Sequence, residues 1–90
     1  MKFTEHSRLA MHDDDLEVDD VIYAINQDEI IERYPNSKPF QSCLLYGRTR
    51  DEKPVHIVCA LPSHVDMLII VTAYLPNQED WIEFRRRRKK

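Results

Sequence analysis

Glycine is nearly absent from this chain of 90 residues, which contains only Gly47. A glycine-rich loop around a nucleotide phosphate, or a Rossmann turn, needs several glycines, so both kinds of site are excluded. Long apolar runs are absent too. The longest, Met67–Ala73, is interrupted by Thr72 and is far shorter than a membrane span. Because the chain also starts without a secretory pattern, the sequence predicts a cytoplasmic protein with no membrane segment.

Cysteine is scarce, and neither cysteine belongs to a motif. Cys43 and Cys59 each lie in an apolar stretch, without a Cys-x-x-Cys pair or a histidine at ligand spacing. We interpret both as buried, reduced thiols. His6 and His12 are six residues apart and do not share a helix face, which argues against a zinc site. No metal or cofactor is expected, and a metalloenzyme or redox function is disfavoured.

The charges are divided unequally along the chain. Of its 13 basic residues, six form the C-terminal run Arg85–Lys90, and all 16 acidic residues precede that run. Residues 1–84 therefore hold seven basic residues against 16 acidic ones, a formal charge of −9. This division predicts a charged partner at one end, either RNA or the acidic face of another protein. Alternatively, the basic run only complements the dipole of a helix C-terminus.

Nine of the acidic residues fall within residues 13–32, which contain no basic residue. One interpretation is a solvated face. The other is a surface that repels anions or docks a basic partner.

Capping residues and apolar alternation predict an α+β fold. Thr4 suits the N-cap of a helix over residues 4–13, and a second helix is expected over residues 18–26. Asn77 predicts the start of a C-terminal helix. The four predicted strands are Ile30–Tyr34, Ser42–Arg50, Pro54–Leu61 and Met67–Leu75. We expect a single domain over residues 1–84, with a four-stranded, mainly antiparallel sheet and a basic tail over residues 85–90.

Two hairpin turns predict which strand residues are neighbours. A turn centred on Glu52 places Arg48 opposite His56, and a turn within Pro62–Asp66 places His56 opposite Tyr74. The three side chains would then form one row on one face of the sheet, about 5 Å apart. A slip of one residue in the second hairpin would move Tyr74 to the other face.

Such a row suits RNA cleavage. A histidine serves as acid or base near neutral pH, and an arginine donates hydrogen bonds to phosphate oxygens. A tyrosine donates a hydrogen bond or stacks on a base. The alternative is that His56 is a partly exposed surface residue and Tyr74 a core residue with a hydrated hydroxyl.

A series of short motifs resembles a family of small prokaryotic proteins known as domain of unknown function 4258. In chain order they are Phe3–Ser7 with Arg8 and Met11, Asp20-Val21, Glu32–Pro35, Ser42–Leu44, Pro54–Val58, Ile69–Tyr74, Pro76, and Trp81 with Phe84 and Arg85. This chain has Asp14 and Asp15 where the family tends to carry Arg-Gly. Aspartate tolerates the left-handed helix end that glycine favours.

The family is similar to the RelE/ParE-type toxin superfamily, including BrnT-like proteins. The resemblance implies a RelE-like fold, an antitoxin partner and cleavage of mRNA by residues on a sheet face. With the row and the basic run it makes Arg48, His56 and Tyr74 candidate catalytic residues. The candidate nucleic-acid-binding residues are His6, Arg8, Arg85, Arg86, Arg87, Arg88, Lys89 and Lys90.

Two functions follow. The first is the toxin of a type II toxin–antitoxin pair, acting as a metal-independent RNA endonuclease. The second is a non-catalytic module that binds a protein partner or a second copy of itself, through its first strand or the acidic face over residues 13–32. The expected partners are therefore an antitoxin, RNA or the ribosome, or a second copy of the chain.

Overall fold

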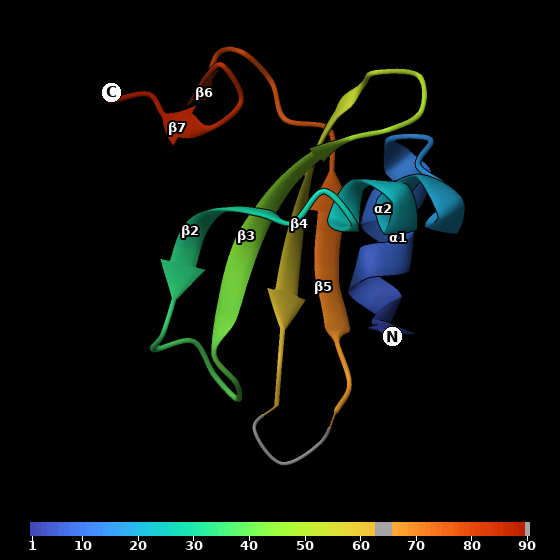
Figure 1. Cartoon of the computed structure of the whole chain (residues 1–90), viewed down its shortest axis with the longest axis vertical. Coiled ribbons are helices and arrows are strands. Elements are labelled where there is room, and N and C mark those ends of the chain that lie inside the picture. Colours follow the sequence, from blue (N-terminus) through green and yellow to red (C-terminus); the bar gives the residue numbers. More distant parts are fainter. Residues whose placement is uncertain (63–65, 90) are drawn as a thin grey trace.

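The computed structural model of this chain describes residues 1–62 and 66–89. The elements are, in order, β1 (Lys2–Phe3), α1 (Glu5–Asp13), α2 (Val18–Ile25), β2 (Glu29–Tyr34), β3 (Ser42–Arg48), β4 (Pro54–Ala60), β5 (Ile69–Tyr74), β6 (Trp81–Ile82) and β7 (Arg86–Arg87) (Figure 1). Both N-terminal helices and β2–β5 lie within two residues of their predicted bounds. The predicted turn at Pro62–Asp66 includes residues 63–65, which lie outside the described residues.

The main sheet has five strands in the order β1-β5-β4-β3-β2. β1 runs parallel to β5, and the other neighbouring strands are antiparallel. The prediction of a four-stranded, mainly antiparallel sheet is therefore wrong. The two residues of β1 are too few to show a strand pattern, and they are held by backbone bonds to the distant β5: the Lys2 amide donates to the Leu68 carbonyl (2.8 Å) and the Thr4 amide to Ile70 (3.1 Å).

Polar side chains fix both ends of α1. The Thr4 Oγ1 accepts a hydrogen bond from the Ser7 amide (3.0 Å), as an N-cap does, and donates to the Val71 carbonyl of β5 (3.1 Å). After the helix, Asp15 adopts the left-handed conformation, with φ of 56°. Asp14 Oδ2 accepts from the Leu75 amide (2.8 Å), so an aspartate at this position ties the helix end to the end of β5.

Both helices cover one face of the sheet, and the main core lies between these two layers. Alternate strand residues such as Leu45, Ile57 and Ile70 pack there against Met11 of α1 and Val21 of α2. Neither helix among the described residues is long and apolar enough to cross a membrane.

Gly47 lets α2 approach β3 closely. A Cβ atom at this position would lie 2.5 Å from the Ala24 carbonyl oxygen, which is closer than such atoms pack. The one glycine of the chain is therefore explained by packing between helix and sheet.

The predicted C-terminal helix is wrong. The Asp80 amide donates to Asn77 Oδ1 (2.8 Å), as in a helix cap, but the chain then forms a hairpin of β6 and β7. Glu83 and Phe84, in the turn, have φ of 52° and 61°, which a right-handed helix does not allow. The hairpin forms because it buries Trp81 and brings the Phe84 carbonyl to His56, contacts that a local helix pattern does not reveal.

Candidate functional site

The second face of the sheet, opposite the helices, carries a buried histidine. His56 on β4 is fully buried, and Tyr46 on β3 beside it is 2% exposed. Trp81 lies over the imidazole, edge to face, with ring centroids 4.4 Å apart. The hairpin over residues 81–87, here called the C-terminal hairpin, therefore covers His56. Figure 1 shows it at the upper end of the sheet, on the side away from α1 and α2.

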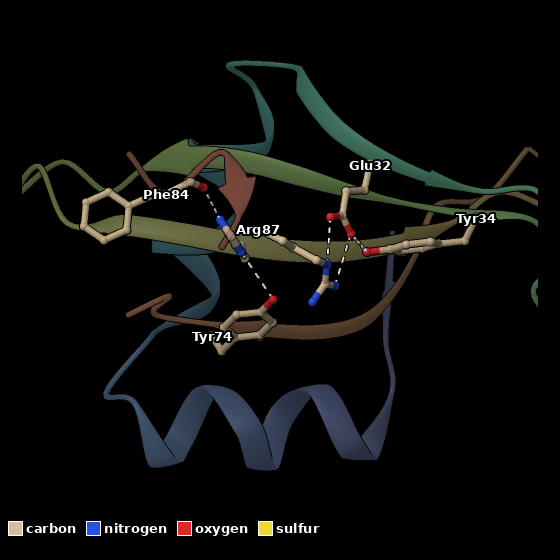
Figure 2. A network of polar contacts seen from close by, with 6 residues as sticks. Glu32, Tyr34, Tyr74, Phe84 and Arg87 are labelled. Atoms are coloured by element: carbon tan, nitrogen blue, oxygen red, sulfur yellow. Dashed lines mark hydrogen bonds and ion pairs between the residues drawn. The ribbon is translucent and has the colours of Figure 1, made fainter. Parts of the chain in front are cut away.

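Both ring nitrogens of His56 have protein partners. Nε2 lies 2.5 Å from the Phe84 carbonyl oxygen, and Nδ1 lies 3.3 Å from the Tyr74 hydroxyl (Figure 2). Because a carbonyl only accepts, Nε2 carries the proton and donates it, and Nδ1 accepts from Tyr74. The imidazole is thereby held as one neutral tautomer.

Burial sets the charge of this histidine. It lowers the pKa of His56 by more than the Phe84 carbonyl and the carboxylate of Glu32 raise it. Burial also raises the pKa of the Tyr74 hydroxyl. His56 is consequently neutral at pH 7 and has no contact with solvent. In this arrangement it serves the structure and cannot exchange a proton with a bound substrate.

The structure supports one of the two predicted neighbours of His56. His56 lies opposite Tyr74 in the β4–β5 pair, as expected. Arg48 lies opposite Pro54, and Tyr46 occupies the place predicted for Arg48. The Arg48 guanidinium turns back to the hairpin turn, where it donates to the Glu52 carbonyl (3.2 Å). The predicted row Arg48–His56–Tyr74 is therefore wrong in one member, because the β3–β4 turn is centred one residue earlier than expected.

Two arginines of the C-terminal hairpin hold carboxylates of β2. Arg87 donates to both carboxylate oxygens of Glu32, at 2.8 and 3.1 Å (Figure 2). Arg85 binds Glu29 in the same way, at 2.6 and 3.4 Å. Tyr34 donates a further hydrogen bond to Glu32 (2.5 Å).

These bonds change how readily the groups titrate. Burial alone would raise the pKa of Glu32, but the hydrogen bonds from Arg87 and Tyr34, with the positive charge of Arg87, lower it overall. The hydrogen bond with Glu32 raises the pKa of Arg87 in turn. The Arg87–Glu32 pair therefore remains ionised across the neutral range.

A β-bulge places both carboxylates on the same side. Glu29 lies opposite Tyr46 and Glu32 opposite Leu44, with a register shift between Ile30 and Glu32. Residues three apart in a regular strand face opposite sides, so the extra residue Ile31 is what brings Glu29 and Glu32 to one face.

The other predicted binding residues are distributed differently. His6 and Arg8 are exposed on α1, which packs on the helix-covered face, away from His56. Arg88 donates to the Gln78 carbonyl (2.7 Å). Arg86 and Lys89 are exposed and form no ion pair within the described residues. Lys90 lies outside the described residues.

Several residues of this site were not predicted from the sequence, namely Glu29, Glu32, Tyr34, Tyr46, Trp81 and the Phe84 carbonyl. The sequence did hold one signal that the second face of the sheet is covered, namely the apolar run Leu44–Gly47, whose residues are all buried. A strand that is apolar on both sides needs a cover on both faces, and Trp81 is the largest apolar side chain left in the C-terminal segment.

A second feature lies at the edge of the sheet. An apolar groove of about 310 Å³, here called the edge groove, is lined mainly by Ile25, Ile30, Cys43, Leu45, Leu61 and Leu68. Asp28 and Arg33 also line it. Among the described strands, β2 pairs only with β3, so its other side is a free edge next to this groove.

Comparison with known protein families identifies the chain. Residues 3–75 match the model described as Domain of unknown function (DUF4258). The chain belongs to this family. No curated protein and no solved structure matches it. The match includes β2 to β5 and ends before the C-terminal hairpin, so the motif of Trp81, Phe84 and Arg85 that was ascribed to the family lies outside the matched residues.

Proposed function

We propose that this DUF4258 protein acts by binding a partner protein, which adds an extended segment to the free edge of β2. The edge groove beside β2 is the observation that carries the proposal. A strand added to an edge directs alternate side chains to one face, and on the helix side of β2 those side chains would enter an apolar groove. Backbone hydrogen bonds would supply affinity, and the groove would select the sequence.

The properties of the groove describe the partner. Ile30 on the edge strand and Leu61 after β4 are 38% and 61% exposed, so the groove presents large apolar side chains to solvent. Residues 1–84 carry a formal charge of −9, so basic residues flanking the added segment would be attracted. An apolar segment with basic flanks, such as part of a small antitoxin, fits both features.

The test is purification of the native protein from its own cells, with its mass measured by light scattering. Ile30→Lys places a charge at the mouth of the groove and is expected to release the co-purified partner. Leu9→Lys is the matched control, because Leu9 is 59% exposed on α1, outside the groove. A wild-type protein that is monomeric at high concentration and brings no partner would refute the proposal.

A second candidate is the RNA endonuclease toxin. It is favoured by the proximity of His56, Tyr74 and Arg87, from three separate elements, on one face of the sheet. Cleavage by His56 would require the C-terminal hairpin to leave that face, because the imidazole is fully buried and both of its nitrogens are bonded.

Induced expression tests this candidate. Growth arrest and cleaved transcripts with the wild type, relieved by His56→Ala, would support it. Val21→Ala is the control for simple destabilisation, since Val21 is fully buried on the helix side. Normal growth with intact transcripts for the wild type would exclude the toxin function.

A further inference from the structure

In the pairs Arg85–Glu29 and Arg87–Glu32, two neighbouring arginines bind two anionic groups of the same chain. Each guanidinium holds both oxygens of one carboxylate, the arrangement in which arginine also binds phosphate. An aromatic ring supports each one: Arg85 lies 4.4 Å from the centroid of Tyr46, and Arg87 lies 4.7 Å from that of Trp81. These rings, both buried, hold the guanidinium groups in fixed positions.

We propose that Arg85 and Arg87 form a binding site for neighbouring phosphates of single-stranded RNA, and that Glu29 and Glu32 occupy it in the absence of RNA. The inference rests on the second candidate function, because it concerns RNA binding, but it does not require cleavage. The two carboxylates act as internal competitors for the phosphates.

The accessibility of the two arginines supports the exchange of a carboxylate for an RNA phosphate. The Arg85 and Arg87 side chains are 43% and 62% exposed, so RNA can reach them while the C-terminal hairpin stays in place. Exposed ion pairs of this kind contribute little to folding, so replacing a carboxylate by a phosphate does not unfold the hairpin. Arg87 also borders a groove of about 530 Å³ that Arg88 and Tyr74 line, which provides room for the adjoining nucleotide.

The charges around Arg85 and Arg87 favour the binding of a polyanion. Arg86 and Lys89 are exposed in the same segment and form no ion pair with another described residue. They attract a nucleic acid electrostatically before any exchange occurs. Arg85 in the turn and Arg87 on β7 both reach carboxylates of the same strand, so the two guanidinium groups lie side by side over β2.

The bulge in β2 shows that the two competitors are positioned as a pair. If β2 were regular and Ile31 were paired instead of bulged, Glu29 and Glu32, three residues apart, would face opposite sides of the sheet and only one arginine could be occupied. Removing the two charges while keeping the shape of the side chains should therefore open both anion positions.

The experiment measures the affinity for a single-stranded RNA oligomer by fluorescence anisotropy at several salt concentrations. Glu29→Gln with Glu32→Gln is compared with Asp13→Asn with Asp19→Asn, which removes the same charge from exposed positions on the helices. The first pair of changes is expected to bind RNA at least about tenfold more tightly than the control, with a salt slope steeper by about 1.4, since each added phosphate contact contributes about 0.7.

Further variants make the result decisive. Arg85→Ala with Arg87→Ala, added to the glutamine variant, should abolish the gain. Glu29→Gln alone keeps the more buried Glu32 and should give part of the gain even if the double variant folds poorly. Equal affinity of the glutamine variant and its control would overturn the proposal, as would binding of polyglutamate as tight as that of RNA. Binding without cleavage would uphold the site and count against the endonuclease alone.

Discussion

The imidazole of His56 donates its Nε2 proton to the carbonyl of Phe84, 28 residues later in the chain. This bond joins the C-terminal hairpin to the main sheet at a point that is closed to solvent. Phe84 presents its carbonyl there from a left-handed backbone conformation, with φ of 61°. A histidine in the middle of a sheet is thus used to hold the last segment of the chain.

The stability of the protein should depend on pH through His56. Burial lowers its pKa in the folded state, so the unfolded chain takes up a proton that the folded chain does not. The contribution of neutral His56 to the free energy of unfolding is complete above about pH 6.5, the ordinary pKa of histidine. This contribution is lost as the pH falls below that value. Urea unfolding between pH 7.5 and 5.5 should show this loss in the wild type. His56→Gln should lack that part of the dependence, and equal dependence in both would contradict the assignment.

Two tyrosine hydroxyls near His56 should have opposite effects on stability. Tyr74→Phe removes the donor to the buried Nδ1 and should lower the free energy of unfolding by about 1–3 kcal/mol. The Tyr46 hydroxyl is buried and has no hydrogen-bond partner among the described residues. Tyr46→Phe should therefore raise the free energy of unfolding by up to about 1 kcal/mol. Chemical denaturation measures both, with the exposed Tyr23→Phe as the control.

Gly47→Ala should destabilise the packing of α2 on β3. The added Cβ would meet the carbonyl oxygen of Ala24, which is backbone and cannot move aside without shifting the helix. We expect a loss of about 1–3 kcal/mol, as for other overpacked sites. Arg48→Ala, at the next position and half exposed, should change stability by less than about 0.5 kcal/mol. A stable Gly47→Ala protein would show that α2 does not lie this close to the sheet.

Glu83→Asn should stabilise the C-terminal hairpin. Glu83 has φ of 52°, which costs most residues about 1 kcal/mol, whereas asparagine adopts this conformation more readily. The expected gain is roughly 0.5 kcal/mol, read as a higher midpoint of thermal unfolding. The β-branched change Glu83→Val should lower the midpoint. No difference between the two variants would mean that the turn does not have this geometry.

The elements that could be predicted from the sequence are those whose signals are local. Thr4 marked the start of α1 through its own capping bond, and Asp15 accepted the left-handed conformation expected after that helix. The antiparallel pairing of His56 with Tyr74 followed from adjacency in the chain, because consecutive strands pair across a turn.

The C-terminal segment shows why other predictions were wrong. Asn77 does accept a cap-like bond, but the following residues form a hairpin and not the predicted helix. What decides between helix and hairpin is the burial of Trp81 against His56 and the bond from His56 to the Phe84 carbonyl, 28 residues apart in the chain. Contacts between residues so far apart leave no periodic pattern in the sequence.

The sequence by itself determined the two capped helices, the strands β2 to β5 and the division of charge between the body and the C-terminal run. These features depend on neighbouring residues and on the alternation of apolar side chains. Only the tertiary structure decided that Arg85 and Arg87 face the carboxylates of Glu29 and Glu32, and that His56 is covered. The physical reason is that a one-residue bulge and a hairpin stabilised by distant contacts decide which side chains meet, and both arise only when the sheet is assembled.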